Sequence, residues 1–129
     1  MQKTFVLLAA LSGLSAVALG AFGAHGLQPL LSAHQLMMWE KAVQYQFYHT
    51  GALLFCVLLA ERLPAALLTW AGRCFAVGIL FFSGSLYLLA TRELTGLSGS
   101  ILGPITPMGG LLFIAGWALL FTAGLKEGE

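Results

Sequence analysis

The chain has 129 residues, of which 59% are hydrophobic and 9% charged, and its mean hydropathy is +0.90. This composition argues against a water-soluble globular protein and predicts an all-α integral membrane protein. The formal net charge of +1, carried by scattered basic residues, argues against a nucleic-acid-binding surface, so the expected surroundings are a lipid bilayer. Spans of about 20 residues leave room for four helices and no soluble domain. We therefore expect a single transmembrane domain, residues 1–129, built as a four-transmembrane-helix bundle.

The first expected span covers about residues 4–24, and none of these residues is charged. Its length suits a full span better than the short apolar region of a signal peptide. Small side chains fall on one side of this helix, which predicts close packing against a neighbouring helix. The residues expected at that contact are Gly13, Ala16, Gly20 and Gly23.

The connection to the second span contains a helix-start pattern. Ser32 is followed three residues later by Gln35, which is typical of a capping box and predicts a helix that begins near Ala33. Two arrangements remain open for residues 33–41. They form a short helix in the membrane interface, or they extend the second span.

The second span, about residues 42–60, is unusual because Gln44, Gln46 and His49 lie in its first half. Amide and ionisable side chains within an apolar helix normally face protein or trapped water. Tyr45 and His49 share one helix face, and Gln46 lies beside it. We therefore expect the other spans to meet the second span along this face.

The third span, about residues 70–90, places Ser83 and Tyr87 on one face of its last third. Residues 91–103 are rich in glycine and serine and predict a loop. The fourth span, about residues 106–124, is expected to begin with Thr106 as N-cap and Pro107 as first helical residue. Close helix contacts are also expected at Gly84, Gly109 and Gly116.

An even number of spans places both termini on the same side of the membrane. Four basic residues near span ends lie on the terminal side, and two lie on the opposite side. The positive-inside rule therefore predicts that both termini are cytoplasmic. The terminal-side residues are Lys3, Arg62, Arg73 and Lys126, and those on the other side are Lys41 and Arg92.

With this topology the polar side chains converge in the outer half of the membrane. One interpretation is structural, because hydrogen bonds between helices would account for most of them. The alternative is a pocket for a small polar or lipid-like ligand. The candidate ligand-binding residues are His25, Tyr45, Gln46, His49, Ser83, Tyr87 and Thr106.

Metal binding and catalysis find less support in the sequence. His25 and His49 could serve as two ligands of a metal or haem, but no third ligand stands at a diagnostic spacing. No acidic residue falls inside an expected span, and no carboxylates are paired. We therefore expect no metal site, no cofactor and no catalytic residue, so the protein is not expected to be an enzyme.

Four motifs resemble a known family. They are LGAFGAHGL from Leu19, AVQYQFYHTGALL from Ala42, LFFSGSLYLLA from Leu80 and TPMGGLLFIAGWALL from Thr106. In these motifs the chain resembles the YgdD/YwdK family of small bacterial inner-membrane proteins of unknown function, which has mitochondrial transmembrane relatives. The resemblance implies a multi-pass helical protein of the bacterial inner membrane. It implies no activity and supplies no catalytic residue.

Two classes of function follow from these observations. The first is a non-enzymatic accessory or structural membrane component that packs against a larger complex or against itself. The second is a carrier or binding protein for a small molecule, a lipid or a quinone, with its pocket beside His49. We favour the first, because four spans are few helices with which to enclose a path across the bilayer. An intramembrane enzyme ranks third.

Overall fold

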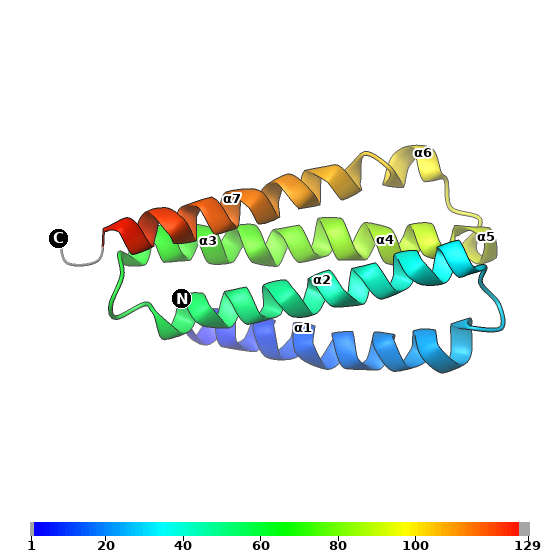
Figure 1. Ribbon diagram of the computed structural model, residues 1–129, viewed down its shortest axis with the longest axis horizontal. Helices are drawn as coiled ribbons and strands as arrows, with labels where there is room; N and C mark the ends of the chain where they lie inside the picture. Colours follow the sequence, from blue (N-terminus) through cyan, green and yellow to red (C-terminus); the bar gives the residue numbers. More distant parts are fainter. Residues whose placement is uncertain (1, 127–129) are drawn as a thin grey trace.

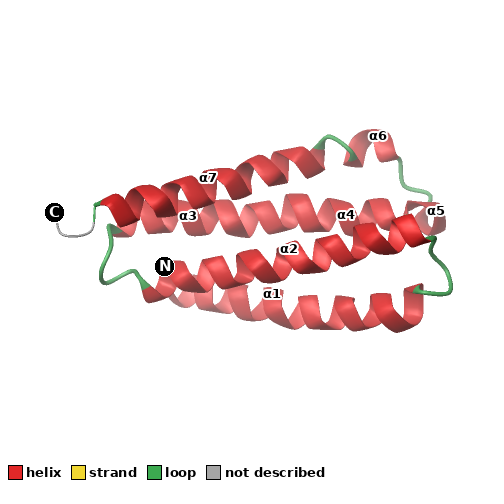
Figure 2. Ribbon diagram, viewed as in Figure 1, coloured by secondary structure: helices red, strands yellow, loops and turns green. Residues whose placement is uncertain are grey.

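Four long helical rods lie side by side in the computed structural model, which describes residues 2–126 (Figures 1 and 2). The first rod is α1 (Gln2–Phe22), which continues into the π-helical turn η1 (Gly23–Leu27). The second is α2 (Ala33–Leu58). The third consists of α3 (Ala65–Gly78), the π-helical turn η2 (Ile79–Ser83) and α4 (Gly84–Ala90). The fourth is α7 (Ile105–Leu125).

Three of the rods are long and apolar enough to cross a membrane, namely Gln2–Leu27, Ala65–Ala90 and Gly99–Leu125. The all-helical membrane bundle expected from the sequence is confirmed. The helix α2 is more polar, so it stays a predicted span. Its 26 residues extend over about 39 Å, which exceeds the ~30 Å thickness of the hydrocarbon core.

The rods form a bundle in which α2 contacts each of the other three. The helix α1 packs on α2, α2 packs on α3 and α4, and α7 packs on α3. Figure 1 shows the same order, from α1 at the bottom to α7 at the top. The most polar helix therefore has a neighbour on each side, and these neighbours can supply hydrogen-bond partners that lipid lacks.

The start of α2 matches the sequence pattern. The Ser32 hydroxyl accepts a hydrogen bond from the Gln35 backbone N–H (3.2 Å), and the Gln35 side-chain oxygen accepts one from the Ser32 N–H (2.8 Å). The capping box and the helix start at Ala33 are thus confirmed. One continuous helix follows, so residues 33–41 extend the rod.

The segment 91–103 and the start of α7 differ from expectation. Two one-turn helices, α5 (Arg92–Thr95) and α6 (Gly99–Leu102), stand where a plain loop was predicted. The helix α7 begins at Ile105 with Pro104 at its N-cap, so Thr106 lies inside the first turn. Pro107 is still in that turn, where its missing N–H leaves no hydrogen bond unmade. A proline pattern alone therefore did not locate the first residue.

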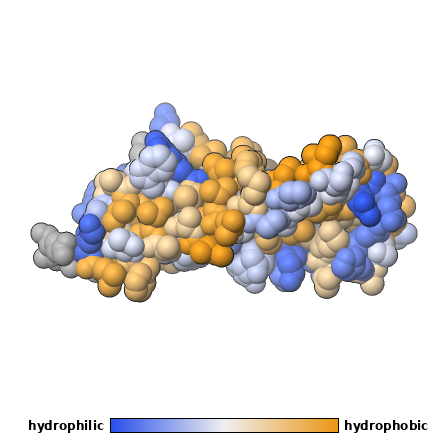
Figure 3. Space-filling view, turned by 90° about the horizontal axis from the view of Figure 1, so that it is seen from above, coloured by the Kyte–Doolittle hydropathy of each residue, from blue (hydrophilic) through white to orange (hydrophobic). Residues whose placement is uncertain are grey.

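The outer surface is consistent with a bilayer. On the face shown in Figure 3, hydrophobic residues cover much of the middle of the molecule, and the most hydrophilic ones gather toward its ends. The helix α1 begins at the same end of the bundle at which α7 finishes (Figure 1). Inside, a buried cluster centred on Leu68, Phe75 and Phe113 joins α3 to α7 and α2.

Candidate functional site

The polar residues near the middle of the bundle form two groups on different sides of α2. Gln46 and His49 both belong to α2, and their side chains are only 4% and 5% exposed. Gln46 faces α1 and α4, whereas His49 faces α7. The single polar cluster predicted from the sequence is therefore wrong, because one helix presents these two side chains to different neighbours.

Gln46 is the centre of the first group. Its side-chain nitrogen donates to the backbone oxygen of Ser12 and to the Ser15 hydroxyl, both at 2.8 Å. Its side-chain oxygen accepts from the Tyr87 hydroxyl at 2.6 Å. Both hydrogens and the oxygen of the amide are thus used, and the bonds join α1, α2 and α4. We call Ser12, Ser15, Gln46, Thr50 and Tyr87 the Gln46 cluster.

The hydroxyl groups of the Gln46 cluster complete a closed network. Thr50 donates to the Gln46 backbone oxygen at 2.7 Å, which uses its only hydroxyl hydrogen. The Ser12 hydroxyl must therefore be the donor in its 2.7 Å bond to Thr50. Ser15 donates in turn to the Ser12 backbone oxygen at 3.0 Å. Such a network suits helix packing.

His49 has two hydrogen bonds that define its state. The indole nitrogen of Trp117 donates to His49 Nε2 at 3.1 Å, and His49 Nδ1 lies 2.7 Å from the Tyr45 backbone oxygen. An indole N–H can only donate and a carbonyl can only accept. His49 is therefore neutral, with its proton on Nδ1.

Aromatic rings surround this histidine. The His49 ring stacks on Phe113 with 3.5 Å between ring centroids and 4° between planes. Tyr45 stacks on Phe82 at 4.8 Å, and Trp117 meets Phe75 edge-on at 5.1 Å. These contacts link α2, α3, η2 and α7 through side-chain packing rather than through several polar bonds.

An open groove of about 720 Å³ lies over this aromatic layer, between α2 and α7. Its size falls within the range of small-molecule sites, and such sites are mainly apolar with a few polar groups. A smaller cavity of about 370 Å³ lies over Gln46, between α1 and α3. The residues that define what we call the aromatic groove are Tyr45, Tyr48, His49, Phe82, Phe113 and Trp117.

Ser83 and Thr106 take part in other helix contacts. The buried Ser83 hydroxyl donates to the Ala42 backbone oxygen at 2.7 Å, which ties η2 to α2. Ser85 donates to the Phe82 backbone oxygen, so Thr106 is the donor in its 2.5 Å bond with Ser85. This bond fastens the start of α7 to α4.

Three of the candidate ligand-binding residues, His25, Ser83 and Tyr87, do not contact His49 through a hydrogen bond. His25 lies in η1 and is exposed, so it joins neither polar group and does not meet His49. Ser83 and Tyr87 bond to other atoms of α2. The partner of His49 is Trp117, because α7 and not α4 faces this side of α2. A helical wheel gives the direction of a side chain but not which helix it meets.

Several polar contacts between helices were not predicted from the sequence. Ser12 and Ser15 stand three residues apart on α1, a spacing that places both on one face of a helix. This was the available signal for a polar contact with the second span. Thr50 similarly follows Gln46 by four residues. For Ser85 and Trp117 the sequence holds no comparable signal.

The glycines expected at helix contacts fall into two sets. A Cβ atom at Gly109 would lie 2.3 Å from the Phe82 backbone nitrogen, and one at Gly116 would lie 2.6 Å from the Phe75 ring. At Gly23 it would lie 2.4 Å from the Trp39 indole nitrogen. At these positions atoms of the neighbouring helix leave no room for a side chain.

The other small residues differ. At Gly13 and Gly20 an added Cβ would make contacts at 3.8 and 3.4 Å, and Ala16 is completely buried. At Gly84 a Cβ would meet nothing within 4 Å, so the close contact expected there is absent.

Comparison with known proteins places the chain in a family. The family described as "Protein of unknown function (DUF423)" matches residues 19–110. A UPF0382 membrane protein of Staphylococcus aureus is 47% identical over 125 residues, which covers 97% of this chain and 98% of the relative. YwdK of Bacillus subtilis, also a UPF0382 membrane protein, is 42% identical over 126 residues, with 97% and 98% covered. No solved structure matches. The resemblance to YwdK is thereby confirmed, and the chain belongs to the UPF0382 (DUF423) family of membrane proteins.

Proposed function

We propose that this protein is a non-enzymatic accessory or structural component of the bacterial inner membrane, whose helices are held together by the Gln46 cluster. The observation that carries the proposal is hydrogen-bond satisfaction. Within residues 2–126, every buried side-chain nitrogen and oxygen atom has a partner. Polar groups inside the bundle are therefore occupied by one another, which is what a packing role requires.

The position of the acidic residues supports a role without catalysis. Glu40, Glu61 and Glu93 are all exposed, and none lies beside His49. A general acid or base must be within hydrogen-bond reach of the reacting group. The one buried histidine already uses both ring nitrogens in bonds to the protein.

The proposal includes an orientation in which both termini are cytoplasmic. The rods place the start of α1 and the end of α7 at one end of the bundle (Figure 1). Arg62 and Arg73 lie at that end as well, whereas Lys41 and Arg92 lie at the other. An excess of basic residues on one side supports a cytoplasmic location for that side. Reporter fusions at the carboxyl terminus test it: a fluorescent protein should be bright and alkaline phosphatase inactive.

Extraction of the full chain from its native membrane in digitonin tests the accessory role. Native gel electrophoresis and mass spectrometry of the resulting band should reveal a discrete assembly larger than the 13.7 kDa protomer. It would contain further copies or a fixed partner at constant stoichiometry. A lone protomer in every mild detergent, with no cross-linked species in intact membranes, would contradict the accessory role.

A second candidate function is supported by the aromatic groove. A carrier or binding protein needs a site that a ligand can enter, and the groove is open and extends to the His49 ring. The cavity over Gln46 is about half as large, at about 370 Å³. The two candidates are compatible, since one uses the inside of the bundle and the other its α2–α7 side.

A further inference from the structure

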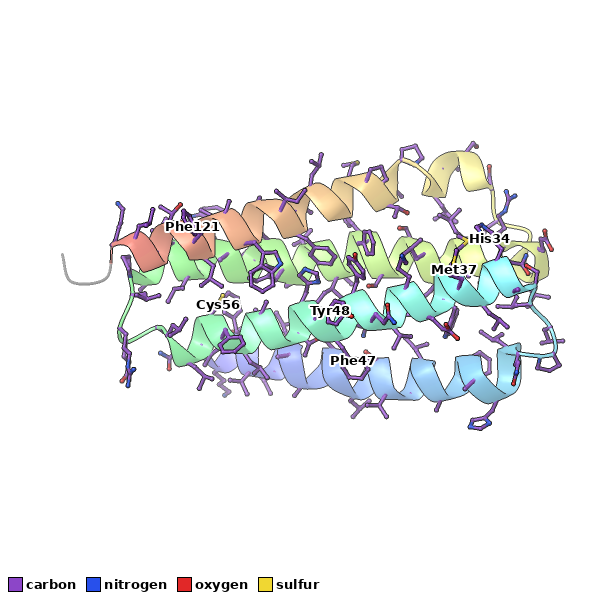
Figure 4. The ribbon with its side chains drawn as sticks, viewed as in Figure 1. His34, Met37, Phe47, Tyr48, Cys56 and Phe121 are labelled. Atoms are coloured by element: carbon purple, nitrogen blue, oxygen red, sulfur yellow. The ribbon has the colours of Figure 1, made fainter. Side chains whose placement is uncertain are left out.

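Two tyrosines of the aromatic groove carry hydroxyl groups that bond to no other residue within 2–126. Tyr48 is 59% exposed, and Tyr45 is partly buried against Phe82. Figure 4 shows Tyr48 near the middle of α2, far from either end of the bundle. By contrast, the hydroxyl of Tyr87 is bonded to Gln46. Tyr45 and Tyr48 thus present free donors at the depth of the hydrocarbon core.

An unpaired hydroxyl at that depth is unfavourable, because lipid tails offer it no hydrogen bond. The centroids of the two rings lie 5.7 Å apart, and both side chains line the groove. A partner from outside the chain that carries oxygen atoms would satisfy both. A lipid acyl chain would fill the groove but would leave both hydroxyls unpaired.

Part of the groove lining, in contact with Tyr45, belongs to a π-helical turn that is held firmly in place. Phe82 of η2 lines the groove. The next residue, Ser83, bonds to the α2 backbone, and the Phe82 backbone lies against Gly109 of α7. Single π-helical turns within α-helices are frequent at functional sites. This turn therefore gives the groove a fixed shape rather than a collapsible one.

The lining indicates the shape of an occupant. Flat rings from α2, η2 and α7 surround the groove, and stacked or edge-on contacts favour a planar ring. We propose that the aromatic groove binds a membrane-soluble molecule of the quinone class, a planar ring with carbonyl or ether oxygens, to which Tyr45 and Tyr48 donate hydrogen bonds. This inference deepens the second candidate function and is independent of the structural one.

The test uses the full chain in lipid nanodiscs, with tritiated 2-decyl-1,4-benzoquinone as the probe and empty nanodiscs as background. Saturable binding at one site per protomer is expected. Decylbenzene has a planar six-membered ring of similar size and the same tail but no oxygens, and it should compete at least about tenfold more weakly, since two hydrogen bonds of ordinary strength are lost. Equal competition by decylbenzene, or no saturable binding, would overturn the proposal.

Two variants locate the site. Tyr45→Phe combined with Tyr48→Phe keeps both rings and removes only hydroxyls that the fold does not use, so binding should weaken about tenfold or more while thermal stability is unchanged. Gly110 also lines the groove, and a Cβ there would meet only the Phe82 ring at 3.9 Å. Gly110→Leu should therefore fold and abolish binding by occupying the groove.

Tyr87→Phe is the matched control, because it removes a tyrosine hydroxyl on the other side of α2. It should leave the affinity for the benzoquinone unchanged. If Tyr87→Phe weakens binding as much as the double variant, or if Gly110→Leu binds normally, the groove is not the site. These results leave the native-gel test of the accessory role unaffected, so failure of either proposal can be recognised separately.

Discussion

The buried polar side chains on the two sides of α2 are accommodated in different ways. On the Gln46 side, five polar residues from three helices satisfy one another through short hydrogen bonds. On the His49 side, one hydrogen bond to Trp117 is surrounded by stacked rings, and a groove of about 720 Å³ stays open. On the side toward α1 and α4 the polar groups are paired with one another, whereas the side toward α7 leaves two hydroxyls without a partner in the described chain.

This difference separates the side of the bundle whose polar groups stabilise the fold from the side that has room for a ligand. Without a hydrophobic driving force between helices, packing and hydrogen bonds hold the rods together. The Gln46 cluster supplies the bonds for α1 and α4. The helix α7 depends more on close backbone contact and ring packing, with single hydrogen bonds from Thr106 to Ser85 and from Trp117 to His49. Substitutions on the Gln46 side should therefore act mainly through lost hydrogen bonds, and substitutions on the α7 side mainly through disturbed packing.

The largest loss of stability is expected from Gly109→Leu, which disrupts the close contact between α7 and η2. The Cβ alone would lie 2.3 Å from the Phe82 nitrogen and 2.7 Å from its Cα, both backbone atoms that cannot move aside. Overpacking of this kind should cost about 3 kcal/mol or more in the free energy of unfolding. Unfolding in a titration of mild detergent with sodium dodecyl sulfate measures it.

Gly84→Leu is the matched control for this variant. It introduces the same side chain into the next rod, where a Cβ meets nothing within 4 Å. Leucine also has a higher helix propensity than glycine, so stability should stay the same or rise by up to about 1 kcal/mol. Equal losses for the two variants would mean that α7 is not seated on η2 as described.

A smaller loss of stability is expected from Gln46→Leu, which removes the central side chain of the Gln46 cluster. The variant removes three side-chain hydrogen bonds and leaves the Tyr87 hydroxyl and the Ser15 hydroxyl without this partner. Bonds between helices in membranes average about 0.6 kcal/mol each, so we expect a loss of about 2 kcal/mol. The aromatic groove should keep its ligand affinity, because Gln46 does not line it.

A variant on the open side should have a weaker effect. Trp117→Phe keeps an aromatic ring beside His49 and removes the indole donor to Nε2. We expect a loss of about 1 kcal/mol. A double-mutant cycle with His49→Phe isolates the bond, because the second substitution should cost less once the first has been made. Strict additivity would show that the two side chains do not interact.

The sequence allowed most of the fold to be predicted. Hydropathy and length located the rods, and the Ser32–Gln35 pattern located the start of α2, because both are local properties of the chain. The start of α7 was missed by two residues, because the N-cap is Pro104 and not Thr106, and prolines are tolerated throughout a first turn. The two one-turn helices after Thr91 have too few residues to show a period.

The pairing of polar residues was less predictable. Gln46 and His49 were correctly recognised as buried, because lipid is a poor environment for both. Their partners depend on which rod lies on which side of α2, and this is a long-range property. Close contact at Gly84 was expected from its small size alone, and size does not tell which side of a rod faces a neighbour, so an added Cβ there meets nothing within 4 Å.

The smallest effect is expected from Tyr48→Phe on α2, and it is best compared with Tyr87→Phe on α4. Tyr87→Phe removes the 2.6 Å bond to the buried Gln46 oxygen, and it should cost about 1 to 2 kcal/mol because that acceptor is left unpaired. Tyr48→Phe removes a hydroxyl that bonds to no residue within 2–126, so the free energy of unfolding should change by less than about 0.5 kcal/mol. The same chemical change thus distinguishes a hydroxyl used by the fold from one available to a ligand. Measured in ligand-free detergent, equal losses would show that Tyr48 is bound within the protein, and its hydroxyl would no longer support a site in the groove.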